Sequence, residues 1–301
     1  RERLQGMTGQ LPKLSVVMPV YNPPIDLLRE AIESVRNQIF DHWELCIADD
    51  ASTDPRVLPL LQEMVRCDPR VRLIARPDNG HISRATNSAV ELATGNFLVF
   101  LDQDDLLTED ALAEIALAIA GYADADIVYS DDDKINEDKQ RFAPQFKPDW
   151  SPELLLSYMY FSHVFAVRTA LFRELGGVRP GFEGSQDYDF ALRAAEQARR
   201  VVHIPKVLYH WRVLPGSTAS SGAAKPESFD NGRRAVEDAL LRRGLRGDAI
   251  HPDWALQAGL GIYGIRFPDD GPRVSIIIPT KNGFEMLRRC IESLRKTTYR
   301  N

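Results

Sequence analysis

Short apolar runs alternate with helix-like segments over the first hundred residues, and this alternation constrains the fold more than any other feature of the sequence. The apolar runs occupy residues 14–20, 43–48, 71–75 and 96–101. The segments between them, whose apolar residues recur with helical spacing, are 25–38, 55–66 and 82–92. Strands that alternate with helices form βα units, which stack into a mainly parallel sheet flanked by helices. The sequence therefore predicts an α/β protein that is Rossmann-like in its first half.

The second half of the sequence has a less regular pattern. It predicts further helices at 108–120, 187–199 and 226–243, and strands at 126–130, 201–204 and 207–208. Residues 217–224 are small and polar, which is typical of a loop that could close over a ligand. The segment at 244–272 looks like a linker, with no predicted structure beyond a possible strand at 260–265.

The start of the first βα unit is repeated near the carboxyl end of the sequence. Residues 14–22 read LSVVMPVYN and residues 274–282 read VSIIIPTKN, and the similarity continues into the helix that follows each copy. Any two βα units can look alike, but Ser, Pro and Asn at fixed spacing favour a true repeat. We therefore expect an N-terminal extension over 1–13, a complete domain over 14–245, a linker-like segment over 246–273, and the truncated start of a second such domain over 274–301.

Composition excludes several classes of function. The 37 Lys and Arg residues are outnumbered by 43 Asp and Glu, so the chain lacks the basic field that nucleic-acid binding requires. The three cysteines have no metal-ligand spacing, which favours a reducing compartment such as the cytoplasm. No run approaches the roughly 20 apolar residues of a membrane span. Membrane contact is therefore expected to be at most peripheral, at the inner face.

Polar clusters follow the four predicted strands of the first half, where open α/β sheets bind their ligands. They are Tyr21-Asn22, Asp49-Asp50, Asn79-Gly80-His81 and Asp102-Gln103-Asp104-Asp105. No GxGxxG or GxxxxGK[ST] loop is present, and Pro23-Pro24 removes backbone donors after the first strand, which disfavours a nicotinamide dehydrogenase. The carboxylates at 102–105 are suited to Mg²⁺ or Mn²⁺. The alternative is a solvated acidic turn, although the apolar strand directly before them favours a metal or ribose site.

These residues resemble the inverting family 2 nucleotide-sugar glycosyltransferases, which have a GT-A type fold. The resemblance covers Leu14 to about Arg212 and rests on the segments at 15–22, 49–54, 87–95 and 101–105, the last containing an Asp-x-Asp (DxD) motif. It implies a mixed, mainly parallel sheet flanked by helices. It also implies a nucleotide-sugar donor, a divalent Mn²⁺ or Mg²⁺ ion, and a saccharide or lipid-linked saccharide acceptor in cell-envelope polysaccharide biosynthesis.

The resemblance implies a role for each matching residue. Contacts to the nucleobase, ribose or diphosphate are expected from Pro19, Tyr21, Asp49, Asp50, His81, Arg84, Asp102 and Arg212. The metal ligands are expected to be Asp104 and Asp102. For His210, a metal ligand and a packed, hydrogen-bonded histidine remain alternatives, and Arg212 is a candidate phosphate contact.

The family's catalytic base usually lies in a Glu-Asp pair at the start of a helix. Here Gln186-Asp187 stands at that place, so the resemblance assigns the base to Asp187. A carboxylate in the first turn of a helix is also favoured by the helix dipole alone, so a capping role is the alternative.

Two clusters and two other functions stay open. The acidic run at 131–133 either lines the acceptor side of the site or is solvated. The aromatic region from Trp150 to His163 either stacks on an acceptor sugar or belongs to the core. The alternatives to a glycosyltransferase are a sugar-phosphate nucleotidyltransferase and a non-catalytic glycosyltransferase-like binding module.

Overall fold

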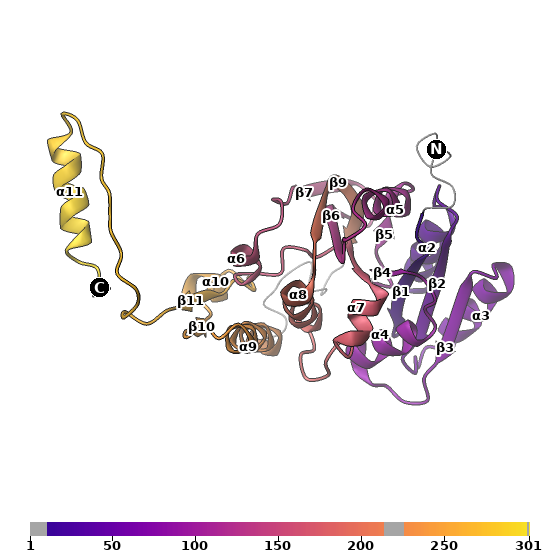
Figure 1. Ribbon diagram of the computed structural model, residues 1–301. Helices are drawn as coiled ribbons and strands as arrows, with labels where there is room; N and C mark the ends of the chain where they lie inside the picture. Colours follow the sequence, from indigo (N-terminus) through magenta and orange to yellow (C-terminus); the bar gives the residue numbers. More distant parts are fainter. Residues whose placement is uncertain (1–10, 214–225, 300) are drawn as a thin grey trace.

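The computed structural model describes residues 11–213, 226–299 and 301 (Figure 1). The strands of its large sheet are β1 Leu14–Val20, β2 Trp43–Asp49, β3 Val71–Ala75, β4 Phe97–Phe100, β5 Leu106–Leu107, β6 Ile127–Ile135, β7 Arg141–Gln145, β8 Phe165–Arg168 and β9 Val201–Arg212. The helices up to residue 242 are α2 Ile25–Arg36, α3 Val57–Cys67, α4 His81–Glu91, α5 Ala111–Gly121, α6 Pro152–Leu155, α7 Thr169–Glu174, α8 Gln186–Gln197 and α9 Pro226–Arg242. The loop predicted at 217–224 lies outside the described residues.

The large sheet is mixed. Its strand order is β3-β2-β1-β4-β8-β6-β9-β5, and β7 pairs with β6. The first four of these strands are parallel. Farther along, β8 is antiparallel to both of its neighbours, β9 is parallel to β6, and β5 is antiparallel to β9. The predicted α/β class and mixed sheet are confirmed, and the parallel part is concentrated around β1.

Helices cover both faces of this sheet, which forms the middle layer (Figure 1). Because side chains alternate along a strand, Val16 and Met18 of β1 pack into one core and Val17 packs into the other. The first core is closed by α2, α3 and α5, and the second by α4, α7, α8 and α9. Because helices cover both faces, a ligand can reach these central strands at the carboxyl ends of β1, β2 and β4.

Two elements of the second half extend farther than the sequence predicted. Strand β6 continues from the predicted 126–130 region to Ile135, so Asp131, Asp132 and Asp133 are strand residues and are buried. The solvated reading of this acidic run was therefore wrong. The two predicted strands at 201–204 and 207–208 are one strand, β9, whose register against β6 shifts near Asp131.

The segment expected to be a linker contains ordered structure. Strands β10 Asp248–Ile250 and β11 Gly264–Arg266 pair antiparallel, with α10 Asp253–Gln257 between them. Tyr263 is buried, its main-chain N–H donates to the Ser157 carbonyl at 2.7 Å, and its ring stacks on Tyr188. This part of the chain therefore packs against the preceding domain.

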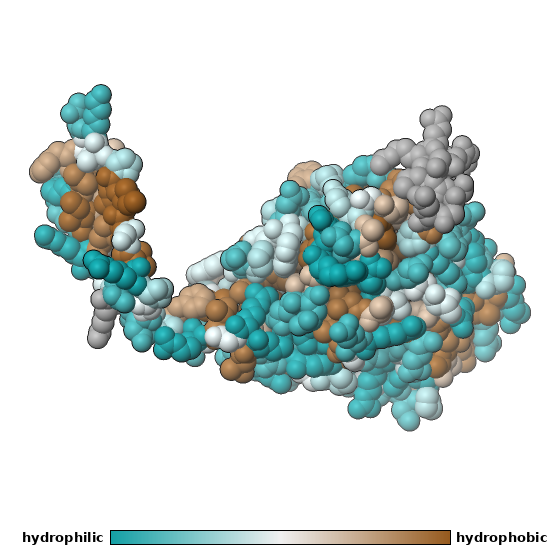
Figure 2. Space-filling model, viewed as in Figure 1, coloured by the Kyte–Doolittle hydropathy of each residue, from teal (hydrophilic) through white to brown (hydrophobic). Residues whose placement is uncertain are grey.

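The second copy of the repeat stands apart from the body (Figure 1). Residues 274–280 form no strand, and the helix α11 Phe284–Leu294 has no buried residue. Apolar side chains gather on this exposed helix, as Figure 2 shows, and Ile277 before it is 89% exposed. The repeat does not enter the first sheet. None of the helices described is both long and apolar enough to cross a bilayer.

Candidate functional site

A cleft opens at the carboxyl ends of β1 and β4. Its walls come from β1 (Pro19), the loop after β4 (Asp102), the segment before β8 (His163) and the first turn of α8 (Asp187). Apolar side chains such as Phe100 and Phe190 also line it. The fold thus brings together residues that are far apart in the sequence, at the edge where the sequence predicted a site.

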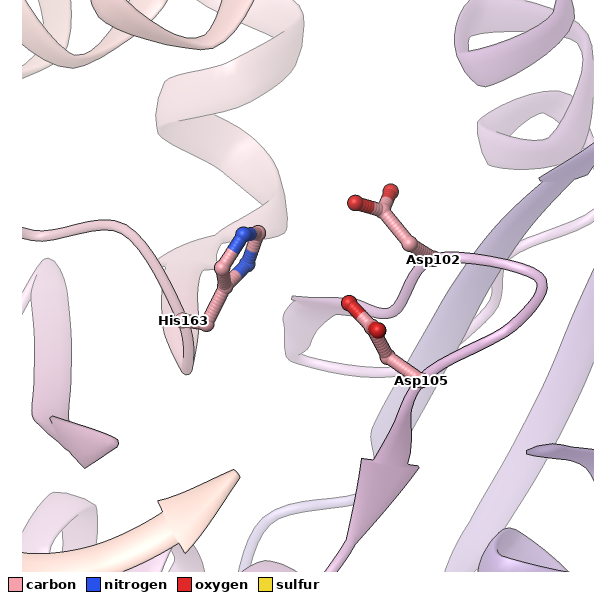
Figure 3. Close-up of side chains that lie close together, drawn as sticks. All are labelled: Asp102, Asp105 and His163. Atoms are coloured by element: carbon pink, nitrogen blue, oxygen red, sulfur yellow. The ribbon is translucent and has the colours of Figure 1, made fainter. Parts of the chain in front are cut away.

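Two carboxylates and one imidazole converge at this cleft, with the Asp105 carboxylate buried behind its lining. One ligand atom from each of Asp102, Asp105 and His163 lies within 4.8 Å of the others. Figure 3 shows Asp102 and Asp105 on one loop, facing the His163 ring across the gap. Carboxylate oxygens suit Mg²⁺ and Mn²⁺, and a neutral imidazole is the commonest metal ligand among protein side chains. The donor set therefore fits the divalent ion that the sequence predicted.

The Asp102–Asp105 loop is held in place by β9. The Tyr209 hydroxyl donates to Asp105 Oδ2 at 2.6 Å, and the Arg212 main-chain N–H donates to Asp105 Oδ1 at 2.7 Å. Arg212 Nε donates to the Asp104 carbonyl at 2.7 Å, and its Nη2 pairs with Glu30 of α2 at 2.9 Å. Arg212 is buried, so the structure places this guanidinium under the loop rather than in the cleft as a phosphate contact.

Burial gives the acidic side chains of the cleft unusual protonation equilibria. It raises the pKa of Asp102 to about 7, and the nearby carboxylates of Asp104 and Asp187 contribute. It also raises the pKa values of Asp104, Asp105 and Asp187. Carboxylates placed together in a poorly hydrated cleft destabilise one another's ionised form, and a bound cation reverses this effect.

The His163 ring is neutral at physiological pH. Burial, and secondarily the positive charge of Lys147, lowers its pKa to about 3. The ring stacks on Tyr209 with centroids 4.4 Å apart, and it meets the Trp211 ring edge-on. A neutral imidazole offers a nitrogen lone pair, which a metal ligand requires.

Asp187 lies in the first turn of α8 and lines the same cleft. Its Oδ1 accepts a hydrogen bond from the Tyr188 main-chain N–H at 2.8 Å. The connection before it is anchored on α9, because Ser185 Oγ donates to the Ser228 carbonyl at 2.7 Å and Asn231 Nδ2 donates to the Glu183 carbonyl at 3.0 Å. Asp187 thus lines the cleft at the start of a helix whose preceding connection is hydrogen-bonded to α9.

The predicted nucleoside contacts lie around the ends of β1 and β2. Asp50 is buried, and its carboxylate accepts hydrogen bonds from Arg76 Nε at 2.7 Å and from the Gly80 N–H at 3.0 Å. Asp49 is also buried and accepts from the Ser52 N–H at 3.3 Å. In this arrangement Asp50 organises the loop that begins α4.

The other residues expected to contact the nucleoside are either exposed or have main-chain groups that are hydrogen-bonded within the protein. His81 and Arg84 are exposed on the first turns of α4, close to that loop. The main chain of Tyr21 is bonded at both ends by Gln103, whose Oε1 accepts from the Tyr21 N–H at 2.7 Å and whose Nε2 donates to its carbonyl at 3.3 Å. Gln103, the middle residue of the Asp-x-Asp motif, therefore joins the β1 and β4 loops.

The structure places two predicted metal ligands outside the carboxylate and imidazole group. His210 Nδ1 lies 2.5 Å from Asp133 Oδ1, because alternation along β9 turns His210 away from the face that carries Tyr209 and Trp211. Asp104 is not in the group formed by Asp102, Asp105 and His163. The geometry favours His163 over His210 as the imidazole of the site.

From the sequence, His163 is expected only as part of an aromatic region that either stacks on an acceptor sugar or belongs to the core. It follows an irregular segment with Pro148 and Pro152, where no element could be predicted. The sequence does carry a signal about His210. In a single strand over 201–212, side chains alternate between faces, so His210 lies on the face opposite Tyr209 and Trp211.

Comparison with known proteins identifies the family and supports the fold. The model of the family described as "Glycosyl transferase family 2" matches residues 15–176. The Staphylococcus aureus TarS structure with UDP-GlcNAc has a TM-score of 0.62 at 22% identity, covering 76% of this chain and 66% of that chain. The mannosyltransferase PcManGT of Pyrobaculum calidifontis, with GDP-Man and Mn²⁺, has a TM-score of 0.57 at 19% identity, covering 77% of this chain and 65% of that chain. These likenesses confirm the GT-A type fold.

Curated relatives are considerably longer than this chain. The uncharacterized protein y4gI of Sinorhizobium fredii is 46% identical over the whole chain, which spans 34% of y4gI. The O-antigen biosynthesis protein RfbC of Myxococcus xanthus is 37% identical over 95% of the chain, which spans 22% of RfbC. The chain thus covers about a third or less of these two proteins. Because the family model matches more than half of its residues, the chain belongs to glycosyl transferase family 2.

Proposed function

We propose that this chain is an inverting, metal-dependent glycosyltransferase that moves a sugar from a nucleotide-sugar donor to a saccharide or lipid-linked saccharide acceptor. The observation that carries this is that Asp102 and His163, grouped closely with Asp105, line the same cleft as Asp187. RfbC is named for O-antigen biosynthesis, and the solved neighbours hold UDP-GlcNAc or GDP-Man, which supports polysaccharide synthesis at the cytoplasmic side of the envelope as the setting.

Each group in the cleft has a distinct task in this proposal. Asp102, Asp105 and His163 would hold a Mn²⁺ or Mg²⁺ ion. Such an ion offsets the charge that develops on a leaving diphosphate. Asp102 would also meet the ribose, while the loop organised by Asp50 would enclose the nucleoside together with His81 and Arg84.

Asp187 would act as the general base. Its carboxylate would accept the proton of the acceptor hydroxyl as that oxygen attacks the anomeric carbon. The attack comes from the face opposite the nucleoside diphosphate, so one displacement inverts the configuration. Burial raises the pKa of Asp187, which strengthens it as a base, while the Tyr188 N–H keeps an ionised form accessible.

The test is a screen of UDP-GlcNAc, GDP-Man and other nucleotide sugars for release of nucleoside diphosphate, with Mn²⁺ and with EDTA. We expect turnover to require the cation and Asp102→Asn to lower it by at least about 100-fold. Asp104→Asn, outside the carboxylate and imidazole group, is expected to have the smaller effect. Full turnover in EDTA contradicts the metal role, and donor binding without any turnover indicates a binding module.

A further inference from the structure

We propose that Lys147 is a positioning residue of this site: paired with Asp132, its ammonium group holds the chain at 161–163 so that the His163 imidazole lies beside Asp102 and Asp105. This inference deepens the proposed function and rests on it, because it concerns the same cleft. Lys147 lies in the connection between β7 and α6, and Asp132 lies on β6.

The Lys147 ammonium is enclosed by oxygen atoms. Its Nζ is 2.7 Å from Asp132 Oδ2, and the side chains of the pair are 4% and 2% exposed. The same nitrogen donates to the carbonyl of Phe161 at 3.2 Å, to that of Ser162, and to that of His163 at 2.6 Å. Three successive residues of one segment therefore bind one cation.

This convergence requires an unusual backbone. Carbonyl groups of successive residues in an extended chain point to opposite sides, so three of them reach one nitrogen only where the chain is bent. His163 has φ = 50°, in the left-handed region that residues other than glycine seldom adopt. The bonds to Lys147 stabilise this bent conformation, which is the one that turns the imidazole into the cleft.

Stability alone is a poor explanation for the pair. Removing an ammonium and a carboxylate from water costs several kcal/mol for each ion, and apolar residues of similar volume are often at least as stabilising. The charged pair also fixes the positions of the three carbonyl groups at 161–163, because all three accept hydrogen bonds from the Lys147 ammonium. Lys147 is itself fixed, because its main-chain N–H donates to Asp131 Oδ1 at 2.9 Å on β6.

The imidazole is restrained from its other side by the site itself. Its ring stacks on Tyr209, whose hydroxyl donates to Asp105. The His163 main chain is thus held by Lys147 and its ring by Tyr209. Loss of the Lys147 bonds would leave the ring with only its stacking contacts, so the imidazole would sample other positions.

The experiment compares two charge-removing double variants. The first, Lys147→Met/Asp132→Asn, removes both charges of the Lys147–Asp132 pair, which we call the clamp. This clamp variant therefore leaves no unpaired ion buried. The matched control is Lys13→Met/Glu44→Gln. It removes an ion pair, with Lys13 Nζ 2.8 Å from Glu44 Oε2, at the amino-terminal ends of β1 and β2, which are opposite to the cleft. Binding of Mn²⁺ alone is followed by the paramagnetic resonance of the free ion. Amide hydrogen exchange is followed in a peptide that contains residues 161–164.

We expect the clamp variant to bind Mn²⁺ about 10- to 100-fold more weakly and to lose exchange protection at 161–164, because outer residues that orient metal ligands have effects of this size. The control is expected to keep both properties even if its unfolding temperature falls. If the double variant does not fold, Lys147→Ala is measured with and without ethylammonium, which is expected to restore Mn²⁺ binding.

The proposal is overturned if the clamp variant binds Mn²⁺ within about twofold of wild type, if protection at 161–164 is unchanged, or if the control is weakened equally. It is also overturned if ethylammonium restores nothing, or if the wild-type protein binds no Mn²⁺. Wild-type protein that binds Mn²⁺ but transfers no sugar contradicts the proposed function instead, and the comparison of variants then still decides the role of Lys147.

Discussion

At the scale of single residues, two acidic side chains to which we assign different tasks line one cleft. Asp102 lies on the loop after β4 and Asp187 on the first turn of α8, and the Asp187 charge contributes to the raised pKa of Asp102. A cation beside Asp102 would lower that pKa and leave Asp187 as the carboxylate free to accept a proton. In the function proposed here, the positions of the two carboxylates thus decide which one binds the cation and which one accepts the proton.

Replacing Asp187 with asparagine tests this division of tasks. Asp187→Asn keeps the size of the side chain and removes the proton acceptor, so turnover should fall about 100- to 10,000-fold while the donor dissociation constant changes less than about threefold. Steady-state kinetics and calorimetric titration of the donor measure the two quantities. Glu63→Gln, at an exposed surface pair, is the control and should match wild type. A parallel loss of donor affinity would make Asp187 a binding residue.

The residues that sequence reasoning located, and those it missed, differ in a physical way. Asp102 and Asp187 were predictable because each adjoins a regular element whose boundary the pattern reveals. His163 was missed as a ligand because its position depends on long-range contacts with Lys147 and Tyr209. Arg212 is expected from the sequence to contact a phosphate, and only the continuation of β9 to Arg212 shows that its guanidinium pairs with Glu30.

At the scale of elements, one buried carboxylate joins the amino-terminal ends of the central strands. Glu44 on β2 accepts hydrogen bonds from Ser15 on β1 at 2.7 Å and from the Thr94 N–H, between α4 and β4, at 2.6 Å. Lys13 pairs with it at 2.8 Å. Burial alone would raise the pKa of Glu44, but these hydrogen bonds outweigh it and lower the pKa to about 2.

This carboxylate should make the stability of the domain depend on acid pH. Because the pKa falls from 4.5 in the unfolded chain to about 2 in the fold, the stabilisation is complete above pH 4.5 and is lost as pH falls from there towards 2. Glu44→Gln should lower the free energy of unfolding by about 1–3 kcal/mol at pH 7 and by less near pH 3. Urea denaturation at both pH values measures this, and an equal loss at both would contradict it.

At the scale of the whole molecule, the chain consists of a packed body and an unpacked repeat. The body extends through the β10–β11 hairpin, since Tyr263 is buried against Tyr188 of α8. In the repeat, which begins at Val274, no residue of α11 is buried. Its exposed apolar residues include Ile277, Phe284 and Met286. We propose that this segment is the first βα unit of a second domain, in keeping with the greater length of y4gI and RfbC.

Truncation distinguishes the body from the repeat. A variant that ends at Pro272 loses only the repeat, so its unfolding temperature and donor affinity should equal those of the full chain. A variant that ends at Leu245 also loses the hairpin and Tyr263, and we expect its unfolding temperature to fall by several degrees because buried apolar area is lost next to Tyr188. Scanning calorimetry measures the unfolding temperatures of the two variants, and titration calorimetry measures the donor affinity. Amides of α11 should exchange quickly in the full chain, because an isolated helix of 11 residues is marginal in water. If removal of 273–301 destabilises the body as much as removal of the hairpin, the repeat belongs to the first domain and the two-domain interpretation is wrong.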